Sequence, residues 1–325
     1  MDNLTNQIKA EAKRLGFSFL GITEPKQTAH FNHYLKWIAE GKNAGLDYLA
    51  MDYVAKGRRD PASLLPRARS VIVGGIQYQP SITLSDISRE KESGNGWIAA
   101  YGTLPDYHKT LKRLFHSLIK CIQELANHDV KSKIFIDSGP VMEKDFAMQA
   151  GLGWIGKNSL LLTPQFGSYC MIGCLFTDIE LLSDKPFDQD ICADCVACIN
   201  ACPTKCINQD KTIDMSRCIS YLTVETQTDF PKDFSKKIGG WVFGCDICQM
   251  VCPVNKESLK KNPGFSPPLM EPRIPQRVIL SEENQIDFEK FDQKYVSTPV
   301  HRIGHRIYLR NIANAFANKL KNEVK

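Results

Sequence analysis

Apolar positions along the first 180 residues alternate between the spacing of a helix and that of a strand. Residues 4–15 place apolar side chains every three to four positions, and Gly16 supplies a stop signal, which predicts an amphipathic helix. Further helices are predicted at 106–125 and 141–150, and short apolar runs predict strands at 17–22, 70–78, 133–137 and 169–177. This alternation indicates a domain of the α/β (α+β) class over roughly residues 1–180.

The rest of the chain is less regular. Residues 82–96 are polar and contain Gly and Ser, which predicts a surface loop, and the Pro- and Lys-rich stretch 255–278 predicts a linker. A last helix is predicted at 304–321, with an apolar face formed by Leu309, Ile312, Ala313, Phe316 and Leu320. The expected parts of the chain are 1–180, 181–258 and 259–325.

The chain has 12 cysteines, and most of them lie between Cys192 and Cys252. The N-terminus shows no apolar signal region and no run of about 18 apolar residues occurs, so a cytosolic protein without a membrane span is expected. Thiols stay reduced in that compartment, and clustered cysteines there indicate metal or redox chemistry rather than disulfides.

The spacing of the first cysteines is specific. Cys192, Cys195, Cys198 and Cys202 follow one another at x2, x2 and x3 spacing, and Pro203 comes next. This is the bacterial ferredoxin run, in which three closely spaced thiolates hold one [4Fe–4S] cubane and the fourth reaches across to a second cubane. The sequence therefore predicts two cubanes rather than one.

The second half of the motif is irregular. Cys245, Cys248 and Cys252 supply three ligands, and Cys218 is the candidate for the eighth. The crossover then gives cluster one Cys192, Cys195, Cys198 and Cys252, and cluster two Cys202, Cys218, Cys245 and Cys248. Two zinc sites are the alternative, but the repeated x2 spacing fits a cubane better and no histidine is near. Free, buried thiols are expected for Cys121, Cys170, Cys174 and Cys206.

The net charge of the chain says little about its binding partners. Its formal value is +5, and two cubanes with their thiolates would bring it to about +1. Its distribution is more informative, because residues 299–325 carry one acid, Glu323, and the bases Arg302, Arg306, Arg310, Lys319, Lys321 and Lys325. Whether this basic tail contacts an anion or is only solvated stays open.

Residues 151–156, Gly-Leu-Gly-Trp-Ile-Gly, match the dinucleotide fingerprint G-x-G-x-x-G. That fingerprint needs a strand before it and a helix after it, whereas here a helix precedes and a strand and turn follow. No acidic residue stands about twenty positions on to bind a ribose. We therefore expect no dinucleotide, and glycines that let the backbone approach a bulky planar ligand.

Asp137 closes the apolar strand 133–137 and opens the turn 137–140, Asp-Ser-Gly-Pro. A carboxylate at a strand end is where α/β sheets place chemistry, and apolar flanks would raise its pKa to suit a proton donor. The alternative is that Asp137 caps the helix that is predicted to begin at Val141. The residues alone favour neither.

Several motifs together resemble the epoxyqueuosine reductase family, cobalamin- and iron–sulfur-dependent enzymes of tRNA maturation. They are the DSGP turn, the GLGWIGKNSLLLTPQFGSY stretch, the first cysteine run and GCDICQMVCPVN, and they fall in order over essentially residues 1–320. The resemblance implies an N-terminal cobalamin-binding domain like that of reductive dehalogenases, which holds the corrin without an axial histidine. A ferredoxin-like domain with two [4Fe–4S] clusters and a short helical tail would follow it.

The resemblance also implies roles for single residues. Asp137 matches the family's proton donor, and residues 106–108 match its Asp-Tyr-His stretch. The implied cobalamin-binding positions are Arg58, Ala99, Asp137, Asn158, Leu161 and Ser220. The preceding residues 99–105, Ala-Ala-Tyr-Gly-Thr-Leu-Pro, depart from the family's commoner arginine-containing stretch, and Ala99 falls there on a position near the corrin.

The implied reaction is the reduction of epoxyqueuosine to queuosine at the wobble position of tRNA, the final step of queuosine biosynthesis. It consumes two electrons and two protons, and Asp137 would protonate the departing oxygen. The expected partners are a tRNA anticodon loop and an external electron donor, with no membrane contact, and the chain is expected to act as a monomer. Arg306 and Arg310, one turn apart, would be placed to reach phosphates.

Two other functions fit part of this pattern. A reductive dehalogenase-like reductase would use the same cofactors on a small molecule, but such enzymes usually carry an export signal. An electron-carrier iron–sulfur protein would use the clusters alone, which leaves the first 180 residues and Asp137 without a task.

Overall fold

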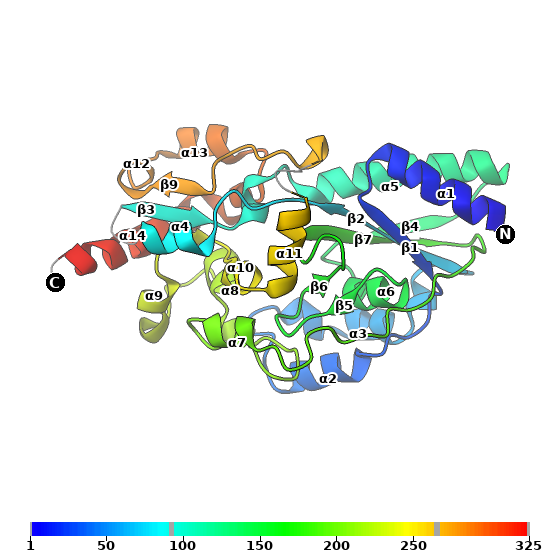
Figure 1. Ribbon diagram of the computed structural model, residues 1–325, viewed down its shortest axis with the longest axis horizontal. Helices are drawn as coiled ribbons and strands as arrows, with labels where there is room; N and C mark the ends of the chain where they lie inside the picture. Colours follow the sequence, from blue (N-terminus) through cyan, green and yellow to red (C-terminus); the bar gives the residue numbers. More distant parts are fainter. Residues whose placement is uncertain (1, 91–93, 263–266, 324–325) are drawn as a thin grey trace. The chain divides into compact units, whose positions relative to one another are not determined.

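The computed structural model describes residues 2–90, 94–262 and 267–323. The chain packs into two compact units, and neither is one continuous stretch (Figure 1). Unit 1 consists of Met1–Gln77 and Tyr107–Asp194, and unit 2 of Tyr78–Asp106 and Cys195–Lys325. None of the described helices is both long and apolar enough to cross a membrane.

Unit 1 is built on a four-stranded sheet. Its strands are β1 (Phe19–Thr23), β2 (Ser70–Gln77), β4 (Ser132–Phe135) and β7 (Cys170–Thr177), in the order β1-β2-β7-β4. Every neighbouring pair is antiparallel. Helices and strands alternate in sequence as predicted, but they do not build the parallel sheet of α/β proteins, so the class is α+β.

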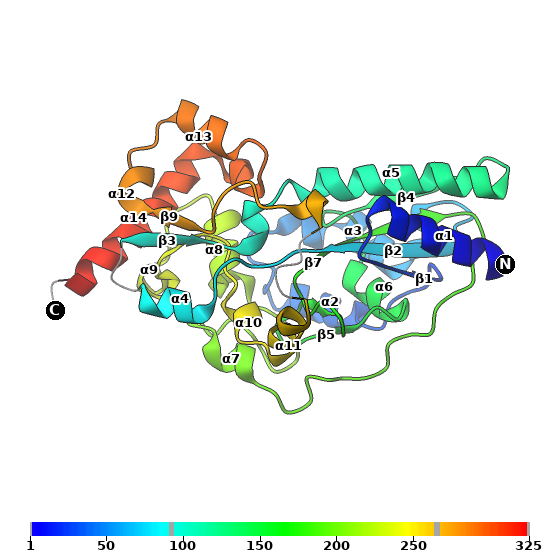
Figure 2. The ribbon, with the colours of Figure 1, turned by 45° about the horizontal axis from the view of Figure 1, so that its top comes forward.

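Helices cover both faces of this sheet. α1 (Asp2–Leu15) and α5 (Tyr107–Ala126) lie on one face and α6 (Glu143–Gln149) on the other (Figures 1 and 2). The ring of Phe115 in α5 packs against Gly74 of β2 and Gly173 of β7, which are paired across the two strands. A Cβ on Gly173 would lie 2.8 Å from this ring, and a Cβ on Gly74 would lie 3.3 Å from it. On the α6 face, Phe146 packs with alternate residues of β2 and β7. The apolar runs are continuous because both faces are buried along β2 and along Gly173 to Thr177 of β7.

The remaining elements of unit 1 are short. They are α2 (Phe31–Ala39), α3 (Asp52–Arg59), the 3₁₀ helices η1 (Asp47–Ala50) and η2 (Pro61–Leu64), and the small hairpin of β5 (Trp154–Ile155) and β6 (Leu161–Leu162).

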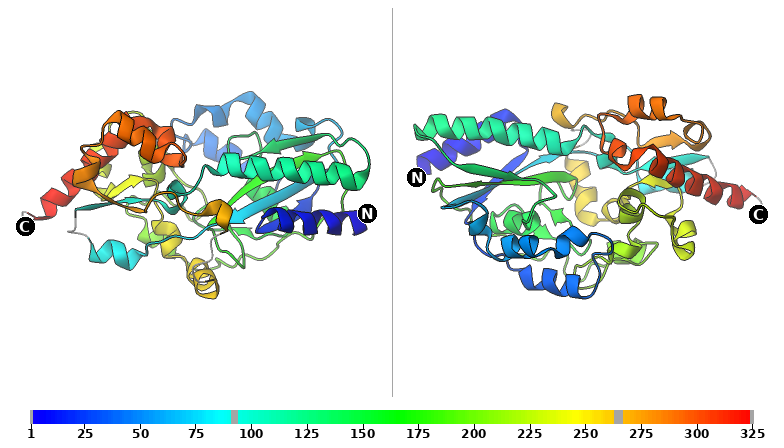
Figure 3. Two further views of the ribbon diagram at one scale, coloured as in Figure 1. Left: turned by 90° about the horizontal axis from the view of Figure 1, so that it is seen from above. Right: turned by 180° about the vertical axis from the view of Figure 1, so that it is seen from behind.

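Unit 2 contains a three-stranded sheet assembled from distant parts of the chain. β3 (Asn95–Ile98) lies between β8 (Trp241–Phe243), to which it is parallel, and β9 (Arg277–Ile279), to which it is antiparallel. α14 (Gly304–Glu323) packs against β8 and β3 (Figure 3). Residues 78–106 therefore belong to unit 2 although unit 1 flanks them in sequence, and the expected divisions at 180 and 258 follow motifs rather than packing.

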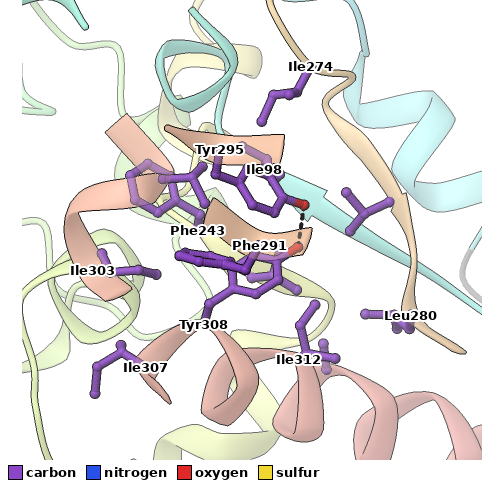
Figure 4. Packing of buried hydrophobic residues seen from close by; sticks show 14 residues of the cluster. Ile98, Phe243, Ile274, Leu280, Phe291, Tyr295, Ile303, Ile307, Tyr308 and Ile312 are labelled. Atoms are coloured by element: carbon purple, nitrogen blue, oxygen red, sulfur yellow. Dashed lines mark hydrogen bonds between the residues drawn. The ribbon is translucent and has the colours of Figure 1, made fainter. Parts of the chain in front are cut away.

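A buried polar group joins the C-terminal helices of unit 2. Glu283 ends α12 (Leu280–Glu283), and its Oε2 accepts hydrogen bonds from Tyr295 at 3.0 Å and Tyr308 at 2.8 Å. The two phenol oxygens are 2.7 Å apart (Figure 4). Tyr295 ends α13 (Phe288–Tyr295) and Tyr308 belongs to α14, so one carboxylate fixes three helices.

The other helices of unit 2 surround the cysteine motifs or flank the sheet. They are α4 (Leu84–Arg89), η3 (Ala100–Thr103), α7 (Ala197–Ala201), η4 (Met215–Arg217), α8 (Ile219–Val224), α9 (Lys232–Ile238), α10 (Ile247–Met250), α11 (Pro253–Lys261), η5 (Pro268–Met270) and η6 (Pro299–Ile303).

Two sequence predictions are wrong in part. The predicted loop 82–96 contains α4, which begins with a reciprocal capping box between Thr83 and Asp86, and it ends in β3. The predicted linker 255–278 contains most of α11, then η5, and the start of β9. Polar composition therefore does not mean irregular structure.

The predicted apolar face of the last helix is also rotated. Ala313 is exposed, whereas Tyr308 and Ala315 are buried. The cause is Asn311, a polar residue that is fully buried because its amide donates to the carbonyls of Thr223 and Val242, both at 2.8 Å. The side chain of Leu320 lies outside the described residues.

Candidate active site

Asp137 lies in a tight turn after β4. The strand ends at Phe135, and Asp137 has a left-handed backbone with φ of +62°. Its Oδ2 accepts a hydrogen bond from the hydroxyl of Tyr107 at 2.8 Å and lies 3.5 Å from Nε2 of His108. The side chain is 57% exposed, so the expected apolar surroundings are wrong, and the carboxylate is instead held by two polar rings from the first turn of α5.

The alternative role of Asp137 as a helix cap is not supported. α6 begins at Glu143, later than predicted, and Met142 occupies its N-cap position without a side-chain cap bond. Asp137 is five residues upstream of that position. Its carboxylate contacts Tyr107 and His108.

Close to Asp137, unit 1 buries charged atoms that lack partners. Nε of Arg58 and Oε1 of Glu143 are buried with no hydrogen bond among the described residues. Burial raises the pKa of Glu143 to about 7, and the negative charge of Asp137 adds to that rise. The Arg58 guanidinium lies 4.5 Å over the ring of Tyr34. Buried polar atoms are rarely left unpaired in folded proteins, so this group has capacity for a polar ligand.

The glycine-rich turn forms the β5–β6 hairpin and follows α6, so it is not a dinucleotide-binding loop. Its glycines also have a role within the protein. A Cβ on Gly153 would lie 2.0 Å from the carbonyl oxygen of Leu162, and one on Gly156 2.5 Å from the Leu162 side chain. Because these glycines have no side chain, their backbone can lie close to Leu162 in the same hairpin.

Two predicted cofactor contacts lie in this hairpin. Asn158 is 2% exposed, and its Oδ1 accepts the N–H of Leu160 at 3.3 Å. The Leu161 side chain belongs to the core between α6 and the sheet. Both residues therefore shape the hairpin, whatever else their backbone groups contact.

The hairpin also contacts the start of the cysteine motif within unit 1. The indole N–H of Trp154 donates to Sγ of Cys192 at 3.4 Å, and Nζ of Lys157 donates to the carbonyl of Ala193 at 2.6 Å. A predicted cluster ligand is thus already supplied with an N–H···S hydrogen bond. The Trp and Lys of the GLGWIGK stretch have a defined structural task here.

In unit 2, the predicted positions Ala99 and Ser220 are linked through Tyr101. The Tyr101 ring lies beside Gly244 and Ala99, and its hydroxyl is hydrogen-bonded to Ser220. Burial raises the pKa of Tyr101 above its usual range. Ala99 is fully buried, so its methyl group packs inside unit 2.

Asp246, inside the second cysteine run, holds this region together. It is fully buried, and its carboxylate accepts the N–H of Ala100 at 2.6 Å and the amide of Gln249 at 3.0 Å. Burial raises its pKa to about 6. Asp246 therefore fastens the η3 turn to the loop that carries Cys245 and Cys248.

Unit 2 brings cysteines from both halves of the motif together. Cys198, Cys202, Cys206, Cys218 and Cys248 pack in one cluster with Ile199, Ile207 and Ile213. Cys218 and Cys252 occupy the N-cap positions of α8 and α11, where free N–H groups favour a thiolate. The thiol of Cys206 lowers the pKa of Cys202 to about 4 and that of Cys218 to about 7 by hydrogen bonding. This donor set fits thiolate ligation.

The basic tail is mostly used inside the protein. Arg310 donates to the carbonyls of Leu222, Thr226 and Thr228 and lies 4.2 Å over the ring of Phe230. Burial lowers its pKa to about 10. The prediction that Arg310 reaches phosphates is therefore wrong, because its guanidinium is hydrogen-bonded to backbone carbonyls.

The other bases of the tail follow the same trend. Arg302 lies 3.8 Å from Glu225, Arg306 donates to Gln227, and buried Lys319 donates to the carbonyl of Glu90. Lys325 and the side chain of Lys321 lie outside the described residues.

Comparison with known proteins agrees with this architecture. Residues 191–255 match the family model of the 4Fe-4S double cluster binding domain, and residues 58–138 match that of "Epoxyqueuosine reductase QueG, DUF1730". A relative from Escherichia coli K12 named epoxyqueuosine reductase is 35% identical over 321 residues, which is 98% of this chain and 82% of the relative. The chain belongs to the epoxyqueuosine reductase family.

Other members of the family give the same picture. The Cyclobacterium marinum epoxyqueuosine reductase is 41% identical over 256 residues, covering 78% of this chain and 80% of the relative. The solved structure from Streptococcus thermophilus matches with a TM-score of 0.83 at 28% identity over 97% of this chain and 81% of that one. A family structure with an epoxyqueuosine-modified tRNA-Tyr stem loop matches with a TM-score of 0.85 at 26% identity, over 98% and 82% of the two chains.

Sequence reasoning missed several residues of the site. Tyr107 and His108 were matched as a motif, but their contacts with Asp137 depend on bringing the start of α5 to the end of β4. Glu143 had a usable signal, an acid in the first turn of a helix just after the Asp-Ser-Gly-Pro turn. Asp246 had one too, an acid enclosed by two cysteines of a cluster motif.

Proposed function

We propose that this chain reduces the epoxide of epoxyqueuosine at the wobble position of tRNA to give queuosine. The observation that carries the proposal is family membership over nearly the whole chain, at 98% coverage of this chain by an epoxyqueuosine reductase. The polar turn at Asp137 supports it, because it offers an oriented acid where the reaction needs a proton. We place the reaction in the cytoplasm, where tRNA is modified.

The eight cysteines of the motif hold the two clusters in this proposal. Cluster one takes Cys192, Cys195, Cys198 and Cys252, and cluster two takes Cys202, Cys218, Cys245 and Cys248. Cys202, Cys218 and Cys248, three of the proposed ligands of cluster two, pack around one core, which supports that cluster; Cys198 of cluster one lies in the same core. An external donor would recharge the clusters one electron at a time.

Cobalamin is the second cofactor of the proposal, and the residues of unit 1 fit it. The unpartnered Nε of Arg58 and Oε1 of Glu143 suit the amide side chains that surround a corrin ring. Asn158 and Leu161 are further proposed contacts in this unit, and the family resemblance adds Ala99 and Ser220 to the proposal. Reduced cobalamin supplies the two-electron chemistry that single clusters do not.

The chain's own part in the reaction is to hold the substrate and supply a proton. The oxygen that leaves an epoxide needs a proton, since a bare alkoxide is costly. Asp137 is the proposed donor; Tyr107, in the first turn of α5, fixes its carboxyl by a hydrogen bond, and the His108 imidazole lies 3.5 Å from it. Their hydroxyl and imidazole are placed to return a proton to Asp137 after each turnover.

The proposed surface for the tRNA backbone is the outer face of α5. Its exposed side chains from position 109 to 120 are Lys109, Lys112, Arg113, His116 and Lys120. No acid occurs between Tyr107 and Gln123, and no ion pair within the described part of the chain engages these bases. Like charges at i,i+3 and i,i+4 destabilise a helix, so this face opposes folding and suits a polyanion.

The test is conversion of epoxyqueuosine-containing tRNA by the anaerobically reconstituted protein, read as queuosine in the nuclease digest. With cobalamin and a low-potential reductant, queuosine should appear and epoxyqueuosine should disappear in equal amounts. Without added cobalamin, conversion should fall to the level of any cobalamin that co-purifies. Loss of epoxyqueuosine without queuosine, or equal turnover without any cobalamin, would contradict the proposal.

A further inference from the structure

Cys206 is a ninth cysteine within a motif that needs eight. It is 3% exposed, and its Sγ lies 3.4 Å from Sγ of Cys202. It is also within hydrogen-bonding reach of Cys218. Both neighbours are proposed ligands of cluster two, so the extra thiol touches two ligands of the same cubane.

The backbone fixes this contact. Pro203 to Lys205 form a turn closed by a hydrogen bond from Lys205 N to the Cys202 carbonyl at 3.2 Å, with Lys205 in the left-handed region at φ of +53°. The carbonyl of Cys206 accepts the N–H of Asp214 at 2.9 Å, and Ile207 forms a β-bridge with Ile213. The turn returns the chain upon itself, and the bridge holds it there.

We infer that Cys206 is not a ligand but a thiol that donates an S–H···S hydrogen bond to cluster two through Cys202. A cubane ligand is a thiolate without a proton, so within the Cys202–Cys206 pair the proton belongs to Cys206. Two thiolates in contact at 3.4 Å would repel each other, and each thiolate of a cubane binds a different iron. The inference rests on the double-cluster domain and not on the proposed reaction with tRNA.

This hydrogen bond has a direct electronic consequence. Reduction adds a negative charge to the cluster and its sulfurs, and a donor to a ligand sulfur stabilises that charge. Cys206 therefore raises the reduction potential of cluster two. Thr204, whose Oγ1 lies 3.5 Å from Sγ of Cys202 and which is fully buried, adds a second donor on the same sulfur.

The experiment is a redox titration of the anaerobic holoprotein followed by EPR, with iron analysis of the same samples. Cys206→Ala should keep the full iron content, and one of the two clusters should become about tenfold harder to reduce, equal to about 59 mV for one electron. Cys206→Ser should restore most of that shift, because a hydroxyl also donates. Cys174→Ala is the matched control, since it removes a buried thiol from the sheet of unit 1 and should leave both potentials unchanged.

Two results would overturn the inference. Unchanged potentials in Cys206→Ala would show that no donor was removed, and loss of about half the iron would show that Cys206 is itself a ligand. If the Ala variant does not fold, the wild-type protein still decides the matter. Its reduced cluster two should show an exchangeable, strongly coupled proton by ENDOR in H₂O that disappears in D₂O, and absence of that proton refutes the hydrogen bond.

Discussion

At the scale of the residue, Asp137 is the side chain with the most specific expected effect. Asp137→Asn keeps the shape and the hydrogen bond from Tyr107 but removes the transferable proton. Single-turnover conversion of epoxyqueuosine by the pre-reduced protein should slow by roughly 10²–10⁴-fold, the usual contribution of a positioned general acid. Cluster and cobalamin content should match the wild type, and wild-type turnover by such a variant would refute the proton-donor role.

Glu143 gives a prediction about pH. Its pKa of about 7 lies above the ordinary value of 4.5, so between these values the folded protein keeps a proton that the unfolded chain has lost. The stabilisation is complete below the lower value and is lost as the pH rises through about 7, a change of about 1–3 kcal/mol in the free energy of unfolding.

Glu143→Gln should remove this dependence, because the amide does not titrate. The melting temperature of the variant relative to wild type should rise as the pH goes from 5 to 8, as measured by anaerobic thermal unfolding. Parallel profiles for the two proteins would mean that the carboxylate is ionised throughout this range.

Sequence reasoning identified the acid at this scale but not its setting. Asp137 was found because it ends an apolar run, a local signal. Its orientation depends on Tyr107, thirty positions away, and its exposure on side chains that no local pattern reports. The burial of Arg58 and Glu143 likewise results from packing between distant segments of unit 1.

At the scale of the element, charge alone would make the basic helix α14 the RNA-binding element, whereas its bases contact the protein itself and those of α5 are exposed. Arg310 on α14 is bound by three carbonyls, so Arg310→Gln should cost about 1–3 kcal/mol of stability and leave those carbonyls unpaired. Arg306→Gln, on the exposed side of the same helix, should be nearly neutral. Urea or thermal unfolding distinguishes the two, and equal losses would contradict the clamp.

The outer face of α5 should instead carry the salt-dependent part of RNA binding. Neutralising Lys112, Arg113 and Lys120 to Gln should weaken binding of a tRNA anticodon stem loop and lower the slope of log K against log salt by about two units. A matched control removes three charges from α9 by changing Lys232, Lys236 and Lys237 to Gln, and it should bind almost as well as wild type. Equal weakening by both triple variants would indicate a general charge effect and no defined surface.

Elements were predictable in proportion to how regular their burial is. β2 is buried along its whole length and β7 from Gly173 to Thr177, and both strands were found at nearly the right residues. α4 was missed because none of its residues is buried, so its only signal is the capping box at Thr83. The face of α14 was misjudged because a buried Asn311 has no apolar signature.

At the scale of the whole molecule, the iron content reports the division of ligands. Cys218→Ala deletes a proposed ligand of cluster two only, so anaerobic protein should retain about half of its iron and sulfide. A full complement of iron in this variant would show that Cys218 is not a ligand that the cluster needs. Its neighbour Cys206 would then be the candidate for the replacing ligand, which the double variant Cys206→Ala/Cys218→Ala would test.

The organisation of the whole chain was the least predictable feature. The motifs suggested consecutive parts, because a sequence pattern shows where chemistry changes along the chain. The structure is instead divided by the pairing of β3 with β8 and β9, and pairing between strands so far apart leaves no local trace. The ferredoxin-like run was evident at once, because its ligands are close in sequence.

β3 and β8 are paired in the sheet but far apart in the sequence, so β3 is synthesised well before its partner. The apolar strand of Trp97 and Ile98 leaves the ribosome about 140 residues before β8 arrives, a delay of about 7–30 s at about 5–20 residues per second. Most of the cysteines of the motif are translated during that interval, and α8, with Cys218 at its N-cap, packs against β8. The second sheet can therefore close only after most of the cluster ligands have been synthesised.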